Sequence, residues 1–331
     1  MKNLENLKIE MRDLGFGEQL IERMEQHMEA NEPRFILYDE LKSDKGRMEL
    51  ALHFNQSKSS EYYYFNKFDL VLEKQPPLAE GKKYFVCSQR QGEDPSVREF
   101  GMPSLAVKDF NWCLERSEQI RGAAQIFVGS ELASSRQLAS MVDGKVLEVE
   151  KDFYKCLMDP APGHTFYIEK GNGFALEQAL NLVSGRSVYR EDMLNIHRNE
   201  YTAWAKLDFD GDRERNGNFP MKTFTQAYGY DLSAVLDRFD FKELGKPELR
   251  EALELSLRNG NRAEVTVQLD GKPAKVLVEA VPEFKQLNIY ALDGRSIKRE
   301  DHLRLEEQAE LGLDKGKSVK KGKEQDQGLS V

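Results

Sequence analysis

At 331 residues, the chain is long enough to bury a substantial core and to divide into two or three domains. Hydrophobic residues make up 40% of the sequence and aromatic residues 10%, which argues against global disorder. A formal charge of −9 argues against a protein that coats nucleic acid or anionic membranes, although 48 lysine and arginine residues leave room for a local basic patch.

The cysteines and the first residues predict a soluble protein of a reducing, cytoplasmic compartment. Cys87, Cys113 and Cys156 are odd in number, far apart and part of no CxxC or Cys/His ligand pair. The opening MKNLENLKIEMRDL has no apolar signal-peptide core, and no apolar run approaches the length of a membrane span. We therefore expect neither a disulfide framework nor a structural zinc site, and no membrane partner.

Residues 1–74 predict an N-terminal helical segment followed by a β-meander. Apolar residues recur at helical spacing from residue 4 to residue 28. Residues rich in aromatic and β-branched side chains then predict strands at 35–38, 48–54 and 62–72. The tyrosine and phenylalanine cluster of the last strand favours packing over a base-stacking platform.

The segment 84–157 follows a linker rich in proline, glycine and charge at 75–83, and it predicts a small α/β piece. We expect a hairpin and two further short strands at 84–88, 96–100, 125–128 and 145–149. Helices are expected at 104–114 and 134–141.

Residues 164–240 predict a central unit, a helix followed by two antiparallel strands. Apolar residues at helical spacing mark the helix at 175–184, and strands are expected at 201–209 and 219–228. The polar stretch DGDRERNGN between the strands is typical of a hairpin loop.

Residues 241–300 repeat that order, with a helix at 249–257 that ends at Asn259–Gly260. Strands are expected at 263–269, 274–280 and 286–292, the first two joined by an Asp-Gly turn at 270–271. Three loose copies of a helix followed by strands indicate internal duplication. We therefore predict an α+β protein of repeated helix-plus-antiparallel-meander units with a small inserted α/β segment, and a disordered Lys-rich tail at 313–331.

The acidic loop at 208–217 and two glycine-containing stretches are the strongest local motifs for ion binding. A calcium loop of the EF-hand type needs glycine at its sixth position and glutamate at its twelfth, where this protein has Arg213 and Phe219. The glycines at 171–173 and 129–130 fit helix capping better than a P-loop or a dinucleotide fingerprint. No metal site and no cofactor are predicted.

The sequence contains no catalytic signature that we can identify. The five histidines fit neither HExxH nor a facial triad: they are His27, His53, His164, His197 and His302. No GxSxG or Cys/His pattern supports a nucleophile, and no acidic pair is singled out as an acid/base dyad. The prediction leans against an enzyme, with a site assembled from distant residues as a weaker alternative.

The most suggestive polar stretch is SGRSVYRED at 184–192. Arginines beside aromatic residues are typical of protein interfaces and of stacked nucleic-acid contacts. On this basis the candidate binding residues are Arg186, Tyr189, Arg190, Trp204 and Lys206. The favoured alternative is a helix-to-strand connection whose arginines pair with Glu191, Asp192 or the helix C-terminus.

Several segments carry a likeness to a known family, among them YYYFNKFDLVLEK, HTFYIEKGNGFALEQALNLVSGRSVYRED, NEYTAWAKLDFD, NFPMKTFTQAYGYDLSAVL and VEAVPEFKQLNIYALDGRSI. These segments resemble an uncharacterised bacterial family, a domain of unknown function associated with conjugative and integrative mobile elements of gut-type anaerobes. The likeness covers most of residues 10–300 and is weakest in 84–157. It implies a cytoplasmic accessory protein beside DNA-processing genes, and it supplies no catalytic residue.

Repeated units and the lack of catalytic motifs favour a non-catalytic binding protein that recognises a protein partner. The alternative is a nucleic-acid-binding accessory of a mobile element, which would use Arg186, Arg190, Lys206 and the Lys-rich tail. The oligomeric state lies beyond what the sequence indicates.

Overall fold

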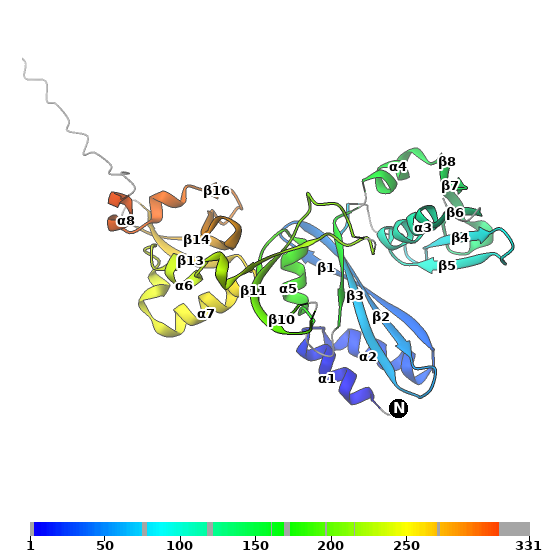
Figure 1. The fold of residues 1–331 in the computed structure, drawn as a ribbon, viewed down its shortest axis with the longest axis horizontal. Coiled ribbons are helices and arrows are strands. Elements are labelled where there is room, and N and C mark those ends of the chain that lie inside the picture. The colour runs from blue at the N-terminus through cyan, green and yellow to red at the C-terminus, as the bar shows by residue number, and fades with distance from the viewer. Residues whose placement is uncertain are drawn as a thin grey trace, which may run out of the picture. The chain divides into compact units, whose positions relative to one another are not determined.

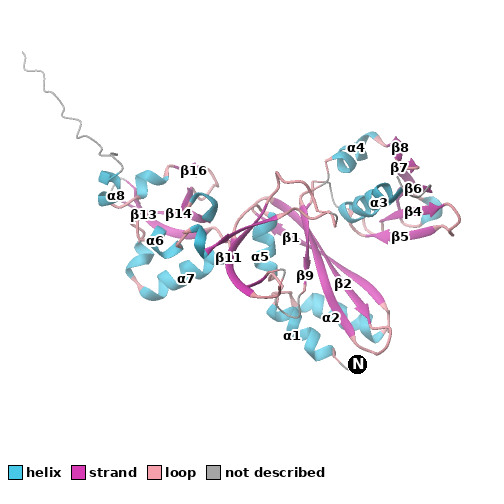
Figure 2. Ribbon diagram, in the orientation of Figure 1, coloured by secondary structure: helices cyan, strands magenta, loops and turns pink. Residues whose placement is uncertain are grey.

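The structure is a computed structural model, which describes residues 3–74, 78–117, 122–159, 161–168, 173–195, 197–214, 216–269 and 272–310. The protein divides into two compact units. The first is Met1–Gly229 with Arg258–Asn261, and the second is Tyr230–Leu257 with Arg262–Val331. In the described ranges the paired strands run antiparallel in four sheets, and helices pack on these sheets, which gives the α+β class predicted from the sequence (Figures 1 and 2).

The N-terminal part of the first unit is a four-stranded sheet in the order β1-β2-β3-β9. Its strands are β1 (Arg34–Ser43), β2 (Gly46–Gln56), β3 (Tyr63–Leu72) and β9 (Gly163–Tyr167). The helices of this part are α1 (Leu4–Asp13), α2 (Glu18–Glu29) and α5 (Leu176–Val183). Gly15 separates α1 from α2 with a φ of 87°, a left-handed conformation that favours glycine.

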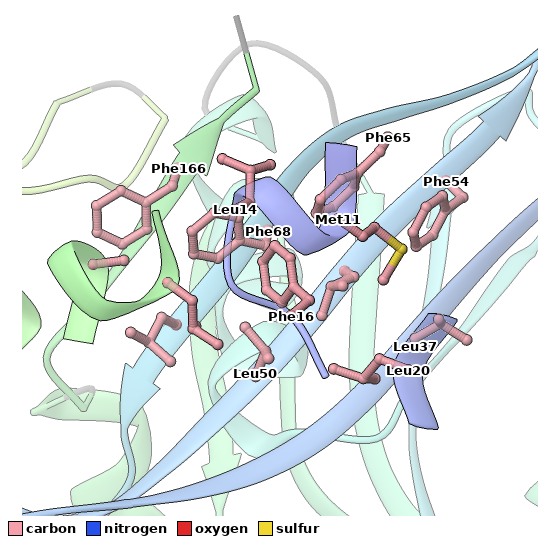
Figure 3. Close-up of a cluster of buried hydrophobic side chains, with 14 of the residues drawn as sticks. Met11, Leu14, Phe16, Leu20, Leu37, Leu50, Phe54, Phe65, Phe68 and Phe166 are labelled. Atoms are coloured by element: carbon pink, nitrogen blue, oxygen red, sulfur yellow. The ribbon is translucent and has the colours of Figure 1, made fainter. Parts of the chain in front are cut away.

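One hydrophobic core joins these helices to the sheet, and Figure 3 shows its centre. Phe16 packs edge-on against Phe65 and Phe68 of β3, with ring centroids 5.5 and 5.3 Å apart. Phe68 in turn stacks on Phe166 of β9 at 5.1 Å. Aromatic residues of β3 therefore supply core packing, as the sequence predicted, while Tyr64 is exposed.

The segment between β3 and β9 forms a five-stranded sheet in the order β5-β4-β6-β7-β8. Its strands are β4 (Lys83–Arg90), β5 (Ser96–Phe100), β6 (Gly122–Gly129), β7 (Arg136–Val142) and β8 (Lys145–Val149). Two α-helices and a 3₁₀ turn accompany them: α3 (Pro103–Ser117), α4 (Lys151–Met158) and η1 (Leu132–Ser134).

The helix predicted at 134–141 is wrong, because most of this stretch is strand β7. Residues 138–141 are all buried, so the strand lacks the alternation of apolar and polar residues that would have marked it. A short continuous apolar run does not distinguish a buried strand from a buried helix.

The third sheet of the first unit has the order β10-β11-β12. Its strands are β10 (Val188–Leu194), β11 (Glu200–Leu207) and β12 (Met221–Thr225), and the 3₁₀ turn η2 (Gln226–Tyr228) follows. The hairpin β11–β12 was predicted. The stretch SGRSVYRED was not predicted as a strand, yet most of it belongs to β10. As an edge strand, β10 tolerates the charged residues that made it resemble a connection.

The second unit contains a four-stranded sheet in the order β13-β14-β15-β16. Its strands are β13 (Ala263–Leu269), β14 (Lys272–Val281), β15 (Gln286–Tyr290) and β16 (Ser296–Ile297). The α-helices here are α6 (Leu232–Leu236), α7 (Pro247–Arg258) and α8 (Leu305–Glu310), with 3₁₀ turns η3 (Lys242–Gly245), η4 (Pro282–Phe284) and η5 (Arg299–His302). The predicted helix and three strands are confirmed.

Three sequence predictions fall outside the described residues in whole or in part. They are the Asp-Gly turn at 270–271, the first two residues of the glycine stretch at 171–173, and the Lys-rich tail at 313–331. Within the part of the protein that the structure describes, none of the helices combines the length and the apolar character needed to cross a membrane.

Candidate functional site

The first unit contains a pocket of about 310 Å³, within the size range of small-ligand sites. Its walls come from β3, α3, β9 and the loop that joins β11 to β12. The chemically distinctive residues that line it are Asp69, Lys108, Trp112, His164, Thr165 and Arg213.

The base of the pocket is a hydrogen-bonded group of side chains around Asp69. Strands β3 and β9 place Asp69 directly opposite Thr165, so the two side chains are neighbours on one face of the sheet. The Thr165 hydroxyl donates to Oδ1 of Asp69. Nε2 of His53 lies 2.6 Å from Oδ2 of the same carboxylate, which is 4% exposed. Both oxygens of Asp69 are therefore engaged within the protein.

Lys108 approaches this group from α3. Its Nζ donates to the Thr165 hydroxyl oxygen at 2.9 Å and lies 3.8 Å from Oδ1 of Asp69. Burial lowers the pKa of Lys108, and the charges of Lys67 and Arg213 lower it further, while the Asp69 carboxylate opposes this shift. An added negative charge in the pocket would favour the ammonium form of Lys108.

Burial alone would raise the pKa of Asp69, because it disfavours the charged carboxylate. The hydrogen bond from His53 and the charges of Lys108, His53 and Lys67 outweigh burial and bring the pKa of Asp69 down to about 2. At neutral pH this carboxylate is ionised, and it holds the Thr165 hydroxyl and the Lys108 ammonium in fixed positions.

Two polar atoms in the pocket wall are buried without a hydrogen-bond partner among the described residues: Nδ1 of His164 and Oγ of Ser104. Burial, assisted by the charge of Lys108, lowers the pKa of His164 to about 4, so its ring is neutral at pH 7. Buried polar groups in native proteins are usually satisfied, and those that are not often mark a functional site. The pocket therefore offers hydrogen-bonding atoms that the protein itself leaves unused.

The remaining wall is the loop between β11 and β12, which the sequence predicted as a simple hairpin connection. Asn218 fixes it to β9, because Oδ1 accepts from the Thr165 backbone N–H at 2.9 Å and Nδ2 donates to the Thr165 carbonyl at 3.1 Å. The guanidinium of Arg213 lies 4.0 Å from the centre of the Phe219 ring and donates to the Gly217 carbonyl at 2.9 Å. A second cation thus faces the pocket from a loop that is anchored at its base.

The candidate arginines from the sequence are engaged in internal contacts, and Arg190 lines an adjoining pocket that shares His164 and Thr165 with the first. Arg186 is 9% exposed; its Nη1 donates to both carboxylate oxygens of Asp44 at 2.9 Å, and its Nε and Nη2 donate to the Asn181 side-chain oxygen. Arg190 forms a two-point ion pair with Asp192. Arg190 therefore pairs with one of the acidic neighbours considered in the sequence analysis, and both guanidinium groups are engaged within the protein.

The other three candidates lie on β10 and β11. Tyr189 faces Trp204 across the two strands with ring centroids 5.4 Å apart, and Trp204 is buried. The guanidinium of Arg258 covers the Tyr189 ring at 4.9 Å. Lys206 is half-buried and faces Lys222 of β12. None of the five predicted binding residues lines the pocket.

No local sequence signal marks the pocket, because its residues come from positions as far apart as Asp69 and Arg213. In the described ranges, no group of three or more His, Cys, Asp or Glu residues is placed to hold a metal ion. Comparison of the sequence with protein-family models, with curated proteins and with solved structures gave no match.

Proposed function

We propose that the protein is a non-catalytic binding protein whose pocket receives an anionic group. The observation that carries this proposal is the presence of two cationic side chains, Lys108 and Arg213, in the wall of one pocket. Both oxygens of the carboxylate beside Lys108 are already engaged by His53 and Thr165. A bound anion would offset the cost of keeping these cations partly desolvated.

The same geometry favours binding over catalysis. The Thr165 hydroxyl is the best-placed nucleophile in the pocket, and its proton is donated to Asp69. A carboxylate with a pKa of about 2 is a weak base, far from the value near the working pH that general-base catalysis requires. His164 does not contact this hydroxyl through any hydrogen bond that the structure shows among the described residues.

We propose further that a cytoplasmic protein partner presents the anion, either as an acidic side chain or as the carboxylate at its own C-terminus. Carboxylates of this kind are compact, and Arg213 offers them a planar pair of donors. The alternative source is a nucleic-acid phosphate, in keeping with the resemblance to a mobile-element family. Both sources present an anion to the same two cations. Acetate represents the carboxylate and inorganic phosphate represents the nucleic-acid phosphate, so comparing the two salts distinguishes them.

The test compares the unfolding temperature of the full-length protein in acetate, inorganic phosphate and chloride at equal ionic strength. Because a ligand that binds only the folded state raises that temperature, acetate should stabilise the protein more than chloride does. The Arg213→Gln variant should lose most of this stabilisation, since it removes one of the two cations. Arg136→Gln, which removes another exposed arginine far from the pocket in sequence, serves as the matched control.

Equal unfolding temperatures in all three salts would overturn the proposal, as would an Arg213→Gln variant that responds like the unmodified protein. A preference for phosphate over acetate would favour the nucleic-acid source over the protein partner.

A further inference from the structure

We propose that the ligand of this pocket is a carboxylate joined to a ring-sized apolar group, with the carboxylate at Lys108 and Arg213 and the apolar group at Trp112. This inference rests on the anion-binding function proposed above and adds the chemical class of the ligand. It follows from the layout of α3, from the apolar part of the wall and from the charge of the pocket.

Helix α3 aligns the two ends of the proposed ligand site. Leu105, Lys108 and Trp112 are separated by three and four residues, which places them on one face of the helix, and all three line the pocket. At a rise of about 1.5 Å per residue, Trp112 lies roughly 6 Å further along the helix than Lys108. A carboxylate bound at Lys108 therefore places its substituent beside Trp112 if that substituent is about the size of one ring.

Part of the pocket wall, on the Leu105 side of Lys108, is apolar. Val71 and Ala161 line the pocket together with Leu105, and these three residues belong to one buried cluster. Leu105 is 7% exposed, so the little surface it retains is part of the pocket wall. Small-ligand sites combine such apolar walls with a few placed polar groups, and here the polar groups gather at Lys108.

Trp112 is held in place before any ligand binds. The guanidinium carbons of Arg90 and Arg98 lie 5.6 and 5.7 Å from the centre of its ring. Arg98 is itself fixed by Asp109, whose Oδ2 lies 3.0 Å from its Nη2. The indole nevertheless remains 37% exposed, and it lines the pocket. A preorganised, partly exposed aromatic wall binds an apolar group without a large entropic cost of ordering.

The charges of the pocket favour a monoanion. Lys108 and Arg213 contribute two positive charges to the lining, and Asp69 and Glu214 contribute two negative charges, with Oδ1 of Asp69 3.8 Å from the Lys108 ammonium. Glu214 lies at the exposed rim, where the Asn216 amide donates to its carboxylate. A dianionic phosphate bound at Lys108 would be repelled by the nearby Asp69 more strongly than a carboxylate with a single negative charge would be.

Two kinds of molecule carry this chemistry: a free aryl acid, and a peptide that ends in an aromatic residue. Their shared feature is one carboxylate beside one ring. The experiment measures dissociation constants of the full-length protein by calorimetry for acetate, phenylacetate, inorganic phosphate and N-acetylphenylalanine. N-Acetylphenylalanine amide, which keeps the ring and loses the charge, is the matched control ligand.

We expect phenylacetate or N-acetylphenylalanine to bind at least about tenfold more tightly than acetate, because the ring is buried against Trp112. Trp112→Ala should reduce that advantage, measured as the ratio of the two dissociation constants in the same variant, to a few-fold. Trp112→Phe should keep most of the advantage, which excludes a general loss of folding as the cause. The tighter of the two ring-bearing acids identifies the source.

Equal affinities for acetate and for both ring-bearing acids would overturn the inference while leaving the anion site in place. Tighter binding of phosphate than of either acid, or binding of the uncharged amide as tight as that of its parent acid, would also overturn it. If no anion binds and Arg213→Gln changes nothing, the proposed function itself fails, which is a different result.

Discussion

His164 lies at a position where protonation is opposed by its surroundings. Its ring stacks at a tilt on Phe166 with centroids 4.8 Å apart, and the groups that act on its charge are Lys108, Arg213 and Asp69. Burial is the largest of these influences, and the two cations add to it, while Asp69 opposes them. The pKa of the imidazole is therefore lowered, and the ring stays neutral in the folded protein far below the pH at which it would be protonated when unfolded.

This shift predicts a loss of stability in mild acid. Between its ordinary pKa of 6.5 and the folded value of about 4, His164 binds more protons in the unfolded state than in the folded one. Stability from this residue is thus fully present above pH 6.5 and declines as the pH falls toward 4, by about 1–3 kcal/mol in the free energy of unfolding. Urea unfolding at a series of pH values measures it.

The control is His164→Gln, which removes this titration and keeps the other histidines. Its unfolding free energy should fall less steeply than that of the unmodified protein over the same pH window. If the unfolding free energies of the two proteins fell in parallel with pH, the lowered pKa of His164 would be contradicted. Asp69, with a pKa of about 2, loses its contribution only at lower pH, so it does not confuse the comparison.

At the scale of elements, the turn 258–261 is fixed to helix α5 by hydrogen bonds from one buried side chain. The buried Asn181 of α5 donates to the Asn259 carbonyl at 2.6 Å and to the Asn261 side-chain oxygen at 2.8 Å, while its own oxygen accepts from Arg186. Gly260 has a φ of 84°, and a Cβ there would meet the Ser187 carbonyl at 2.8 Å. The turn can pack closely against Ser187 because Gly260 has no side chain, and the Asn181 amide bonds the residues before and after that glycine.

Replacing Asn181 with leucine should therefore destabilise the first unit. The change keeps the approximate volume of the residue and leaves the buried Arg186 guanidinium without two of its acceptor contacts, a loss of about 2–4 kcal/mol. Thermal or urea unfolding measures the loss. Gln19→Leu, an exposed change of similar kind on α2, should alter stability by less than about 0.5 kcal/mol. Comparable effects of the two substitutions would show that the amide network contributes little.

Most elements of this fold are visible in the sequence because their signals are local. The end of α7 at Arg258 is marked by Asn259–Gly260, and the core strand β3 by its aromatic residues. Strand β7 was mistaken for a helix because its buried residues are consecutive, and β10 was missed because an edge strand carries charge. In both strands the pattern of apolar and polar residues reflects the strand's position in its sheet, which the segment's own sequence does not reveal.

The pocket, by contrast, was not visible in the sequence. Asp69 and Thr165 are 96 positions apart and meet only because β3 pairs with β9, and Lys108 reaches them from a helix in the segment between. Nothing in the local sequence of any one of these residues indicates the other two. The arginines that the sequence singled out for their aromatic neighbours, Arg186 and Arg190, are engaged internally with Asn181 and Asp192.

At the scale of the whole molecule, the formal charge of −9 opposes binding to polyanions. With Arg186 and Arg190 held in ion pairs, the nucleic-acid alternative rests on Lys206, the cations of the pocket and the Lys-rich tail. The leading proposal predicts no binding to single- or double-stranded DNA or RNA at moderate salt. Fluorescence anisotropy at low and moderate salt measures it, and a variant that ends at residue 310 tests the tail. Binding that falls steeply with salt would contradict this expectation.

Residues 258–261 belong to the first unit, but the ribosome synthesises them only after it has begun the second unit. The polypeptide leaves the first unit at Gly229, and the next residue that belongs to it is Arg258. At roughly 5–20 residues per second, a ribosome adds the intervening segment in a few seconds. During that interval Asn181 has been synthesised and its partners Asn259 and Asn261 have not. The nascent first unit therefore lacks the hydrogen bonds that the Asn181 amide donates until the first segment of the second unit, Tyr230–Leu257, has been translated.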